Sequence, residues 1–221
     1  MADLSTWHGA PEPERVTLGG RYVRLEPLDA ARHENDLYAV VTLPGAEERL
    51  RYLPDPIPAD VADFHGWMQA GMLSHDPLFF AVIDKVTGRV GGRQALMHIV
   101  PLHGTIEIGH VLWGPAINRS RVTTEALYLT AHYVFEALGY RRFEWKCNAR
   151  NEKSRTAALR FGFRFEGIFR NHMVVKGESR DTAWFAMTDD DWPLLKPRFE
   201  EWLAPENFDD VGQQKTALAI R

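Results

Sequence analysis

The stretch from Thr105 to Phe163 constrains the fold of this chain most, because it places two strand–turn–helix units directly in series. In the first unit, a mostly apolar strand ends at Trp113 and leads into a basic, hydroxyl-rich turn. From Thr123 to Leu138, apolar side chains then recur every three or four residues, which is typical of one face of a helix. The pattern switches from a strand to a helix period within a few residues, so this unit predicts a helix that begins at a polar turn.

The second unit follows at once. Phe143, Trp145 and Cys147 alternate with polar residues, which predicts a strand. A short helix is expected from Ser154 to Phe161, closed by Gly162. A helix that connects two strands makes them parallel and adjacent. The two polar turns are therefore expected at the same edge of one sheet, where helix amino ends converge, and this favours a ligand site there.

The remaining segments extend this core into a larger sheet. Glycine-containing turns predict further strands over residues 16–18, 21–26, 78–83, 90–100, 163–175 and 181–187. Periodicity and capping residues predict helices over residues 29–41, 60–73 and 189–202. We expect one domain of the α/β (α+β) class at residues 16–203, with a mixed, mostly antiparallel, seven-stranded sheet flanked by helices. Residues 1–15 and 204–221 are expected to be tails.

Composition excludes several classes of function. The 221 residues carry a net charge of −4, which argues against nucleic-acid or anionic-membrane binding, because both need a basic surplus. Cys147 is the only cysteine, so neither an intrachain disulfide nor a thiolate metal cluster can form. No signal peptide or membrane-spanning run is evident. We expect a cytoplasmic protein that binds neither nucleic acid nor membrane and uses no metal.

Five short motifs occur in order along the chain: Ile106–His110, Thr124–Ala126, Phe135–Gly139, Asn151–Arg155 with Phe161–Gly167, and Gly177 with Asp181. Together they resemble the GNAT superfamily of acyl-CoA-dependent N-acyltransferases, and most closely the ribosomal-protein N-terminal acetyltransferases of the RimJ/RimL type. The resemblance covers roughly residues 16 to 190. It implies transfer of an acetyl group from acetyl-CoA to a primary amine, on a protein N-terminus or a small molecule, by direct attack. It leaves homodimerisation and a preference for longer acyl chains open.

The resemblance also implies where acetyl-CoA binds. Backbone groups of Val111, Leu112 and Trp113 would pair with the pantetheine amides. The turn and the helix start that follow would hold the pyrophosphate, through Asn118, Arg119, Ser120, Arg121, Val122 and Thr123.

This turn departs from the family pattern of Arg or Gln, two residues, Gly, one residue, then Gly or Ala. Asn118, Arg121 and Thr123 occupy those positions here. Glycines let backbone N–H groups approach a phosphate closely, whereas an arginine offers a guanidinium instead. We interpret the turn as modified rather than lost. The alternative is a CoA-binding or degenerate module without turnover that acts as a regulator or interaction partner.

Two residues are the predicted catalytic groups. The resemblance places Ser154 where its hydroxyl could donate a proton to the departing thiolate, with Asn151 bonding the cofactor or the substrate; both could instead be helix caps. Glu107 is the predicted base that accepts the amine proton; its alternative role is an ion pair, with Lys146 as one partner. By strand alternation, Glu107 and His110 are expected on opposite faces.

The proline-rich segment after the first predicted helix is expected to shape the acceptor pocket, since loops tend to carry specificity. It contributes Tyr52 and Leu53. Arg49 and Arg51 could attract an acidic substrate there, and the neighbouring Glu47–Glu48 pair could equally cancel that charge.

Overall fold

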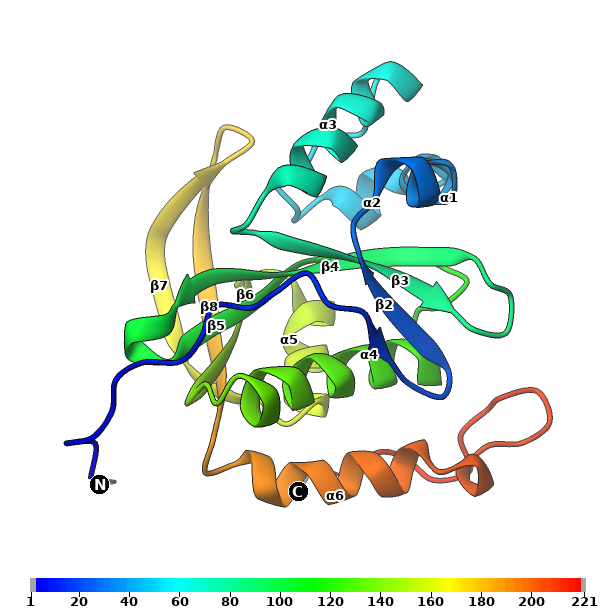
Figure 1. Ribbon diagram of the computed structural model, residues 1–221. Helices are drawn as coiled ribbons and strands as arrows, with labels where there is room; N and C mark the ends of the chain where they lie inside the picture. Colours follow the sequence, from blue (N-terminus) through cyan, green and yellow to red (C-terminus); the bar gives the residue numbers. More distant parts are fainter. Residues whose placement is uncertain (1–2, 220–221) are drawn as a thin grey trace.

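The computed structural model describes residues 3–219, in which one mixed sheet has helices on both faces (Figure 1). The strand order is β1-β2-β3-β4-β5-β6-β8-β7. The strands are β1 (Leu18–Gly19), β2 (Val23–Pro27), β3 (Leu78–Asp84), β4 (Val90–Val100), β5 (Thr105–Trp113), β6 (Arg142–Asn148), β7 (Arg164–Val175) and β8 (Glu178–Thr188). The sheet thus has eight strands rather than the seven predicted, and its first strand, β1, overlaps the predicted segment 16–18.

All neighbouring strands are antiparallel except β5 and β6, which are parallel, as the helix between them predicted. The parallel register runs only from Thr105 opposite Arg142 to Ile108 opposite Trp145. The second half of β5 therefore has no partner on β6, although β4 continues to pair with it on the other side as far as Trp113.

The sheet separates two hydrophobic clusters, and β3 shows how. Its even-numbered residues, including Phe80, belong to the cluster under α4, α5 and α6, whereas its odd-numbered residues, including Phe79, belong to the cluster under α1 and α3. Strand side chains alternate between faces, so a strand buried on both sides must be apolar throughout. The sheet is thus a middle layer, and each of its faces can be identified by the cluster that its side chains join.

Helices α1 (Ala30–Thr42) and α3 (Val61–Leu73) cover one face (Figure 1). An aspartate caps each of them: Asp29 accepts from the N–H of Arg32, and Asp60 accepts from the N–H of Asp63. The short α2 (Ala46–Leu50) was not predicted. It begins at Gly45, whose φ of +83° turns the chain after α1.

The other face carries α4 (Arg121–His132), α5 (Glu152–Arg160) and α6 (Trp192–Leu203). The α4 helix continues as a π-helical turn over Tyr133–Ala137. Beyond α6, the chain turns back through a short 3-10 helix (Pro205–Asn207) and buries Phe208, whose ring packs edge-on against both Tyr22 and Trp202. The segment after Leu203 thus packs over the amino end of α4.

Candidate active site

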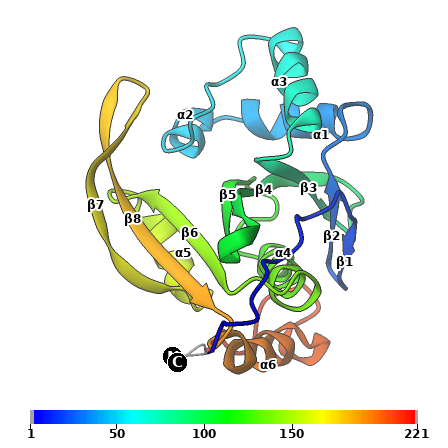
Figure 2. The same ribbon diagram turned by 60° about the vertical axis from the view of Figure 1, so that its left-hand side comes forward.

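A cleft of about 740 Å³ opens where β5 and β6 part. In Figure 2, the hairpin of β7 and β8 rises on one side of this region and α1, α2 and α3 lie on the other. The β5 strand bulges at His110, which has a φ of +48°, and this bulge shifts the register with β4. The backbone of β5 beyond Ile108 therefore borders the cleft without a strand partner on that side.

The structure brings most, but not all, of the predicted site residues together. Those that line the cleft are Glu107, Val111, Leu112, Trp113, Asn118, Asn151 and Ser154. The remaining five predicted cofactor residues lie outside its lining: Arg119, Ser120, Arg121, Val122 and Thr123. The division falls inside the turn between β5 and α4, directly after Asn118.

Ser154 lies in the first turn of α5, and its hydroxyl has a defined orientation. The Nε1–H of Trp145 donates to the Ser154 Oγ at 2.9 Å, which occupies one acceptor position and does not use the hydroxyl proton. Asn151 caps the helix: its Oδ1 accepts from the Ser154 N–H at 3.2 Å. The cap uses the amide oxygen, so the amide N–H₂ of Asn151 remains available at the cleft.

Cys147 is a core residue. Its side chain is buried in the cluster under α4, α5 and α6. Burial raises the pKa of this thiol, against the opposing effect of a hydrogen bond with Ser154. A thiol with a raised pKa is a poor nucleophile at neutral pH.

Glu107 is almost fully buried and is the centre of a small ionic network. The Lys146 ammonium lies 2.9 Å from its Oε2, so the ion pair considered from the sequence is present. The same carboxylate oxygen lies 2.6 Å from Nδ1 of His98. A carboxylate can only accept, so Nδ1 carries the proton and Nε2 of a neutral His98 is left as a base. This hydrogen bond, more than any other contact, raises the pKa of His98.

His98 was missed in the sequence. It has a φ of +47° in a second bulge of β4, and the Asp76 carboxylate holds that bulge by accepting from the N–H groups of His98 and Ile99 at 2.9 and 3.0 Å. The position of a bulge depends on the pairing of two strands and on a distant carboxylate, so no local sequence pattern indicated it.

The prediction that Glu107 and His110 lie on opposite faces was wrong. Glu107 lies opposite Met97 of β4, and Met97 is two residues from Ala95, so all three side chains share one face of the sheet. Ala95 belongs to the cluster under α1 and α3, which identifies that face. The ring of His110 lies 5.1 Å from that of Phe79 in the same cluster. The bulge at His110 adds a residue, which reverses the alternation beyond it and places both side chains on one face.

The turn between β5 and α4 is organised by its own contacts. Ser120 caps α4, its Oγ accepting from the N–H of Val122 at 3.1 Å. The Arg121 guanidinium stacks 4.4 Å from the ring of Tyr22 and 5.4 Å from that of Phe208. Thr123 is buried. By contrast, Arg119 is exposed and has no ion-pair partner among residues 3–219.

The α4 helix is fixed to the start of the sheet by Glu125. Its buried carboxylate accepts from the backbone N–H groups of Arg21, Tyr22 and Val23 at 2.6–2.8 Å. A side chain at Gly20 would put its Cβ 2.4 Å from this carboxylate, so the glycine turn and the glutamate fit each other. The Thr-Glu-Ala motif thus sets the position of the α4 amino end relative to β2.

The segment after α2 lies over the cleft, and an ion pair anchors it. Asp55 pairs with the fully buried Arg93 at 2.6 Å and accepts from the Trp67 Nε1–H at 3.0 Å. Burial alone would raise the pKa of Asp55, but hydrogen bonding with His110 and the charge of Arg93 outweigh it and hold the pKa far below its usual range. This partly buried carboxylate is therefore ionised at neutral pH and pairs with the Arg93 guanidinium.

The anchored segment contributes to the cleft as expected. Tyr52 and Leu53 both line it, and the Tyr52 hydroxyl donates to the carbonyl of Arg150 at 3.4 Å, across from the α2 side to the entry of α5. The two arginines and two glutamates nearby are not equivalent. Arg49 donates to the carbonyls of Val40, Leu43 and Pro44 at the end of α1, whereas Glu48 pairs with Lys153 at 3.2 Å.

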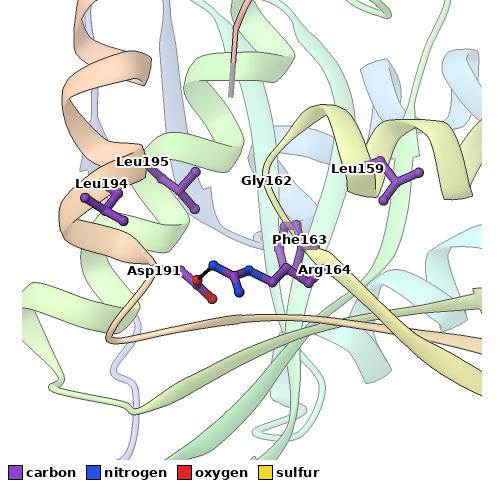
Figure 3. Close-up of a pocket in the computed structure, with 7 residues that line it drawn as sticks. All are labelled: Leu159, Gly162, Phe163, Arg164, Asp191, Leu194 and Leu195. Carbon is purple, nitrogen blue, oxygen red and sulfur yellow. Dashed lines mark ion pairs between the residues drawn. The ribbon is translucent and has the colours of Figure 1, made fainter. Parts of the chain in front are cut away.

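A second, smaller hollow of about 320 Å³ lies between the end of α5 and the start of α6 (Figure 3). An ion pair of 2.5 Å between Arg164 and Asp191 borders it, and Leu194 and Leu195 contribute its α6 side. None of the predicted site residues lines this hollow. The chemistry therefore belongs to the larger cleft.

A mixed sheet in which one parallel strand pair separates to form a cleft, with helix amino ends at its border, defines the fold class of acyl-CoA-dependent N-acyltransferases. The family model for the acetyltransferase (GNAT) domain matches residues 23–164. The chain belongs to the GNAT family.

Two solved structures are similar over most of the chain. A GCN5-related N-acetyltransferase from Brucella melitensis is 56% identical, with a TM-score of 0.95 and 97% of each chain covered. A protein described as a probable GNAT-family acetyltransferase from Chromobacterium violaceum is 38% identical, with a TM-score of 0.80, over 87% of this chain and 96% of that one. The RimL ribosomal L7/L12 alpha-N-protein acetyltransferase is 19% identical over 78% of this chain and 94% of that one, with a TM-score of 0.68, so it shares the fold. No curated protein sequence matches the chain.

Two further findings concern residues 3–219. No helix in this range combines the length and the apolar character needed to cross a membrane. In the same range, His, Cys, Asp and Glu side chains form no group of three or more that could hold a metal ion.

Proposed function

We propose that this protein transfers an acetyl group from acetyl-CoA to a primary amine by direct attack of the amine on the thioester. The observation that carries the proposal is the cleft itself. Where β5 loses β6 as a partner, Ser154 and Asn151 lie on one side, and Glu107 with His98 lies on the other. A donor for a leaving thiolate and an acceptor for an amine proton thus line one space.

The residues present fit acetyl-CoA. The unpaired backbone of β5 at Val111, Leu112 and Trp113 can bond an extended amide-containing arm as a missing strand would. The N–H groups of the first turn of α4 and the exposed guanidinium of Arg119 can hold phosphate. Acetyl-CoA supplies an activated acetyl thioester, and the protein supplies orientation and proton transfer.

The chain's own residues then divide the proton transfers. An attacking amine must be uncharged, although most free amines are protonated at neutral pH. The His98–Glu107 pair accepts the proton: Nε2 of His98 is the basic atom, and Glu107 stabilises the resulting imidazolium. On the opposite wall, the Ser154 hydroxyl, oriented by Trp145, donates its proton to the thiolate and regains one from solvent. Glu107 was the base predicted from the sequence. In this proposal it acts through His98, which the sequence did not indicate.

The finer assignments are also proposals. We place the chain with the RimJ/RimL type on its sequence motifs, which makes a protein N-terminus one candidate acceptor and a small-molecule amine the other. We further propose a cytoplasmic protein. Homodimerisation is proposed through the outer strand β7, which exposes Ile168, Phe169, Met173 and Val174 at a sheet edge.

Thiol release from acetyl-CoA, measured against a panel of free amines and peptide N-termini, tests the proposal. We expect release that depends on one class of amine and mass spectra that show an added acetyl group. Acetyl-CoA binding without release for any amine would favour the alternative, a CoA-binding module without turnover. The departure of the turn at Asn118–Thr123 from the family pattern supports that alternative.

A further inference from the structure

Arg180 is a cation in the cleft that the protein itself does not neutralise. It lines the cleft from β8, and its Nε is buried without a hydrogen-bond partner. Within residues 3–219, no carboxylate lies at ion-pair distance from it. Burial lowers the pKa of Arg180, although a guanidinium stays charged at neutral pH. A partly buried charge without a partner is costly and is most often found where a ligand supplies the partner.

The other cations around the cleft already have partners. Arg49, whose Nε is also buried without a hydrogen-bond partner, donates through its terminal nitrogens to the carbonyls of Val40, Leu43 and Pro44. The Lys146 ammonium pairs with Glu107 at 2.9 Å and with Glu144 at 2.7 Å, and Lys153 pairs with Glu48. The Lys176 ammonium donates to the carbonyl of Leu50, at the end of α2. Arg180 therefore differs from these neighbours in having no partner. Its unpaired positive charge is a local feature of the cleft, because the whole chain has a net charge of −4.

Strand geometry places Arg180 on the acceptor side of the sheet. Ala183 and Phe185 of β8 join the cluster under α4 and α5, so the even-numbered residues of β8 face the other way. Trp184, on that other face, stacks under the Lys146 ammonium at 4.1 Å, and Lys146 pairs with Glu107. Arg180 thus shares a face with the proposed base, whereas the proposed phosphate site, at the α4 amino end, belongs to the opposite face.

We propose that Arg180 forms a carboxylate subsite, so that the acceptor is an amine that also carries a carboxylate, such as a free amino acid or a peptide with an acidic side chain near its N-terminus. This inference rests on the proposed function. A planar guanidinium matches a carboxylate through two parallel hydrogen bonds. A single guanidinium without a side-chain hydrogen bond suits a monoanion better than a phosphate dianion. The amine would then lie toward His98 and Glu107 while Arg180 holds the other end.

Matched acceptors test the inference by turnover. Thiol release is compared for L-alanine, L-leucine and L-phenylalanine against their amides, for Ala-Glu amide against Ala-Gln amide, and for phosphoethanolamine. We expect the carboxylate members to be preferred, and the two kinds of pair tell an α-carboxylate from a side-chain carboxylate. Arg180→Gln should raise the KM of the preferred carboxylate about tenfold or more, with little change in kcat or in the KM of its amide, and Arg180→Lys should recover part of the loss. Preference for phosphoethanolamine, or equal loss for acid and amide, would overturn the inference.

A charge-matched control and a binding readout complete the design. Arg170→Gln removes the same charge from β7 at an exposed position outside the cleft lining, and it should leave each KM unchanged. The buried Nε–H of Arg180 gives an NMR signal that Arg180→Gln identifies. With CoA present, about 10 mM L-leucine should shift this signal and L-leucinamide should not. A shift without thiol release would refute the proposed function and retain the subsite, whereas thiol release with no shift by any carboxylate of the panel would refute the subsite alone.

Discussion

The turns that follow β5 and β6 look alike in the sequence and differ in the structure. Both lie at the carboxyl ends of the parallel strands, and each starts a helix with a capping side chain, Ser120 on α4 and Asn151 on α5. The turn after β6 presents Asn151 and Ser154 to the cleft. The turn after β5 presents Asn118, while its Arg121 stacks on Tyr22.

The difference shows that the polar side chains at a helix start can either face a ligand site or be held by packing within the protein. At α5, Tyr52 contacts the entry of the helix, but Asn151 and Ser154 still line the cleft, so their side chains remain available to a ligand. At α4, the segment around Phe208 packs over the helix start and takes up the guanidinium of Arg121. Backbone N–H groups and Arg119 are then what the α4 turn has left to offer a phosphate. The predictions below test this division, from the largest expected effect to the smallest.

Ser154→Ala should have the largest effect, because it removes the proposed proton donor. We expect kcat to fall about 100-fold, within the usual range for a general acid. The Trp145 Nε1–H loses its acceptor, so the free energy of unfolding should also fall by about 1 kcal/mol. Steady-state thiol release and denaturant unfolding measure the two effects. A kcat within about threefold of the wild-type value would remove Ser154 from the mechanism.

His98→Asn should lower kcat about tenfold, because it removes the basic nitrogen while asparagine tolerates the positive φ. The pH profile is the sharper readout. Glu107 raises the pKa of His98, and the base must be neutral, so kcat/KM should fall as the pH drops through that raised pKa.

Glu107→Gln removes the carboxylate and lowers the pKa of His98, so the acidic limb of the profile should move to lower pH. The pH dependence of stability runs opposite to that of activity. Because the pKa of His98 is raised in the folded protein, its protonation stabilises the fold below the unfolded pKa of about 6.5, and this stabilisation is lost as the pH rises through the folded pKa. An acidic limb that stays in place in the variant would contradict a coupled His98–Glu107 base.

The two arginines of the α4 turn should separate binding from stability. Arg119→Asn should raise the KM of acetyl-CoA about fivefold and leave stability unchanged, because it removes an exposed charge and keeps a residue that accepts a φ of +56°. Arg121→Ala should lower the free energy of unfolding by about 1 kcal/mol, with little change in KM, because its guanidinium stacks on aromatic rings. The reverse pattern would show that Arg121 reaches the phosphates.

Ser120→Ala should have the smallest effect on activity. It removes the N-cap of α4, which is expected to lower the free energy of unfolding by about 1 kcal/mol. Turnover should stay near the wild-type value, in contrast to the serine of the other turn. A loss of kcat comparable to that of Ser154→Ala would erase the distinction between the two turns.

The sequence predicted the features that depend on local patterns. The switch from strand to helix period predicted that β5 and β6 are parallel, and a capping residue and the helical spacing of apolar residues predicted α1 and α3 respectively. It did not predict the bulge at His110, because a bulge is set by pairing with β4, and the strict alternation assumed for β5 then assigned His110 to the wrong face.

Contacts between segments that are distant in the sequence could not be predicted either. The stacking of Arg121 on Phe208, the His98–Glu107 hydrogen bond and the unpaired state of Arg180 all depend on elements that meet only in the folded chain. The sequence therefore indicated which turns border the cleft. It did not indicate which side chains of these turns are held in packing contacts and are therefore not available to a ligand.

Calorimetric titration with acetyl-CoA tests most directly whether the space between β5 and β6 binds this ligand. We expect saturable binding of one acetyl-CoA per chain, retained by Ser154→Ala, weakened by Arg119→Asn and little changed by Arg121→Ala. Absence of binding to the wild-type protein would contradict the acyl-CoA cleft outright.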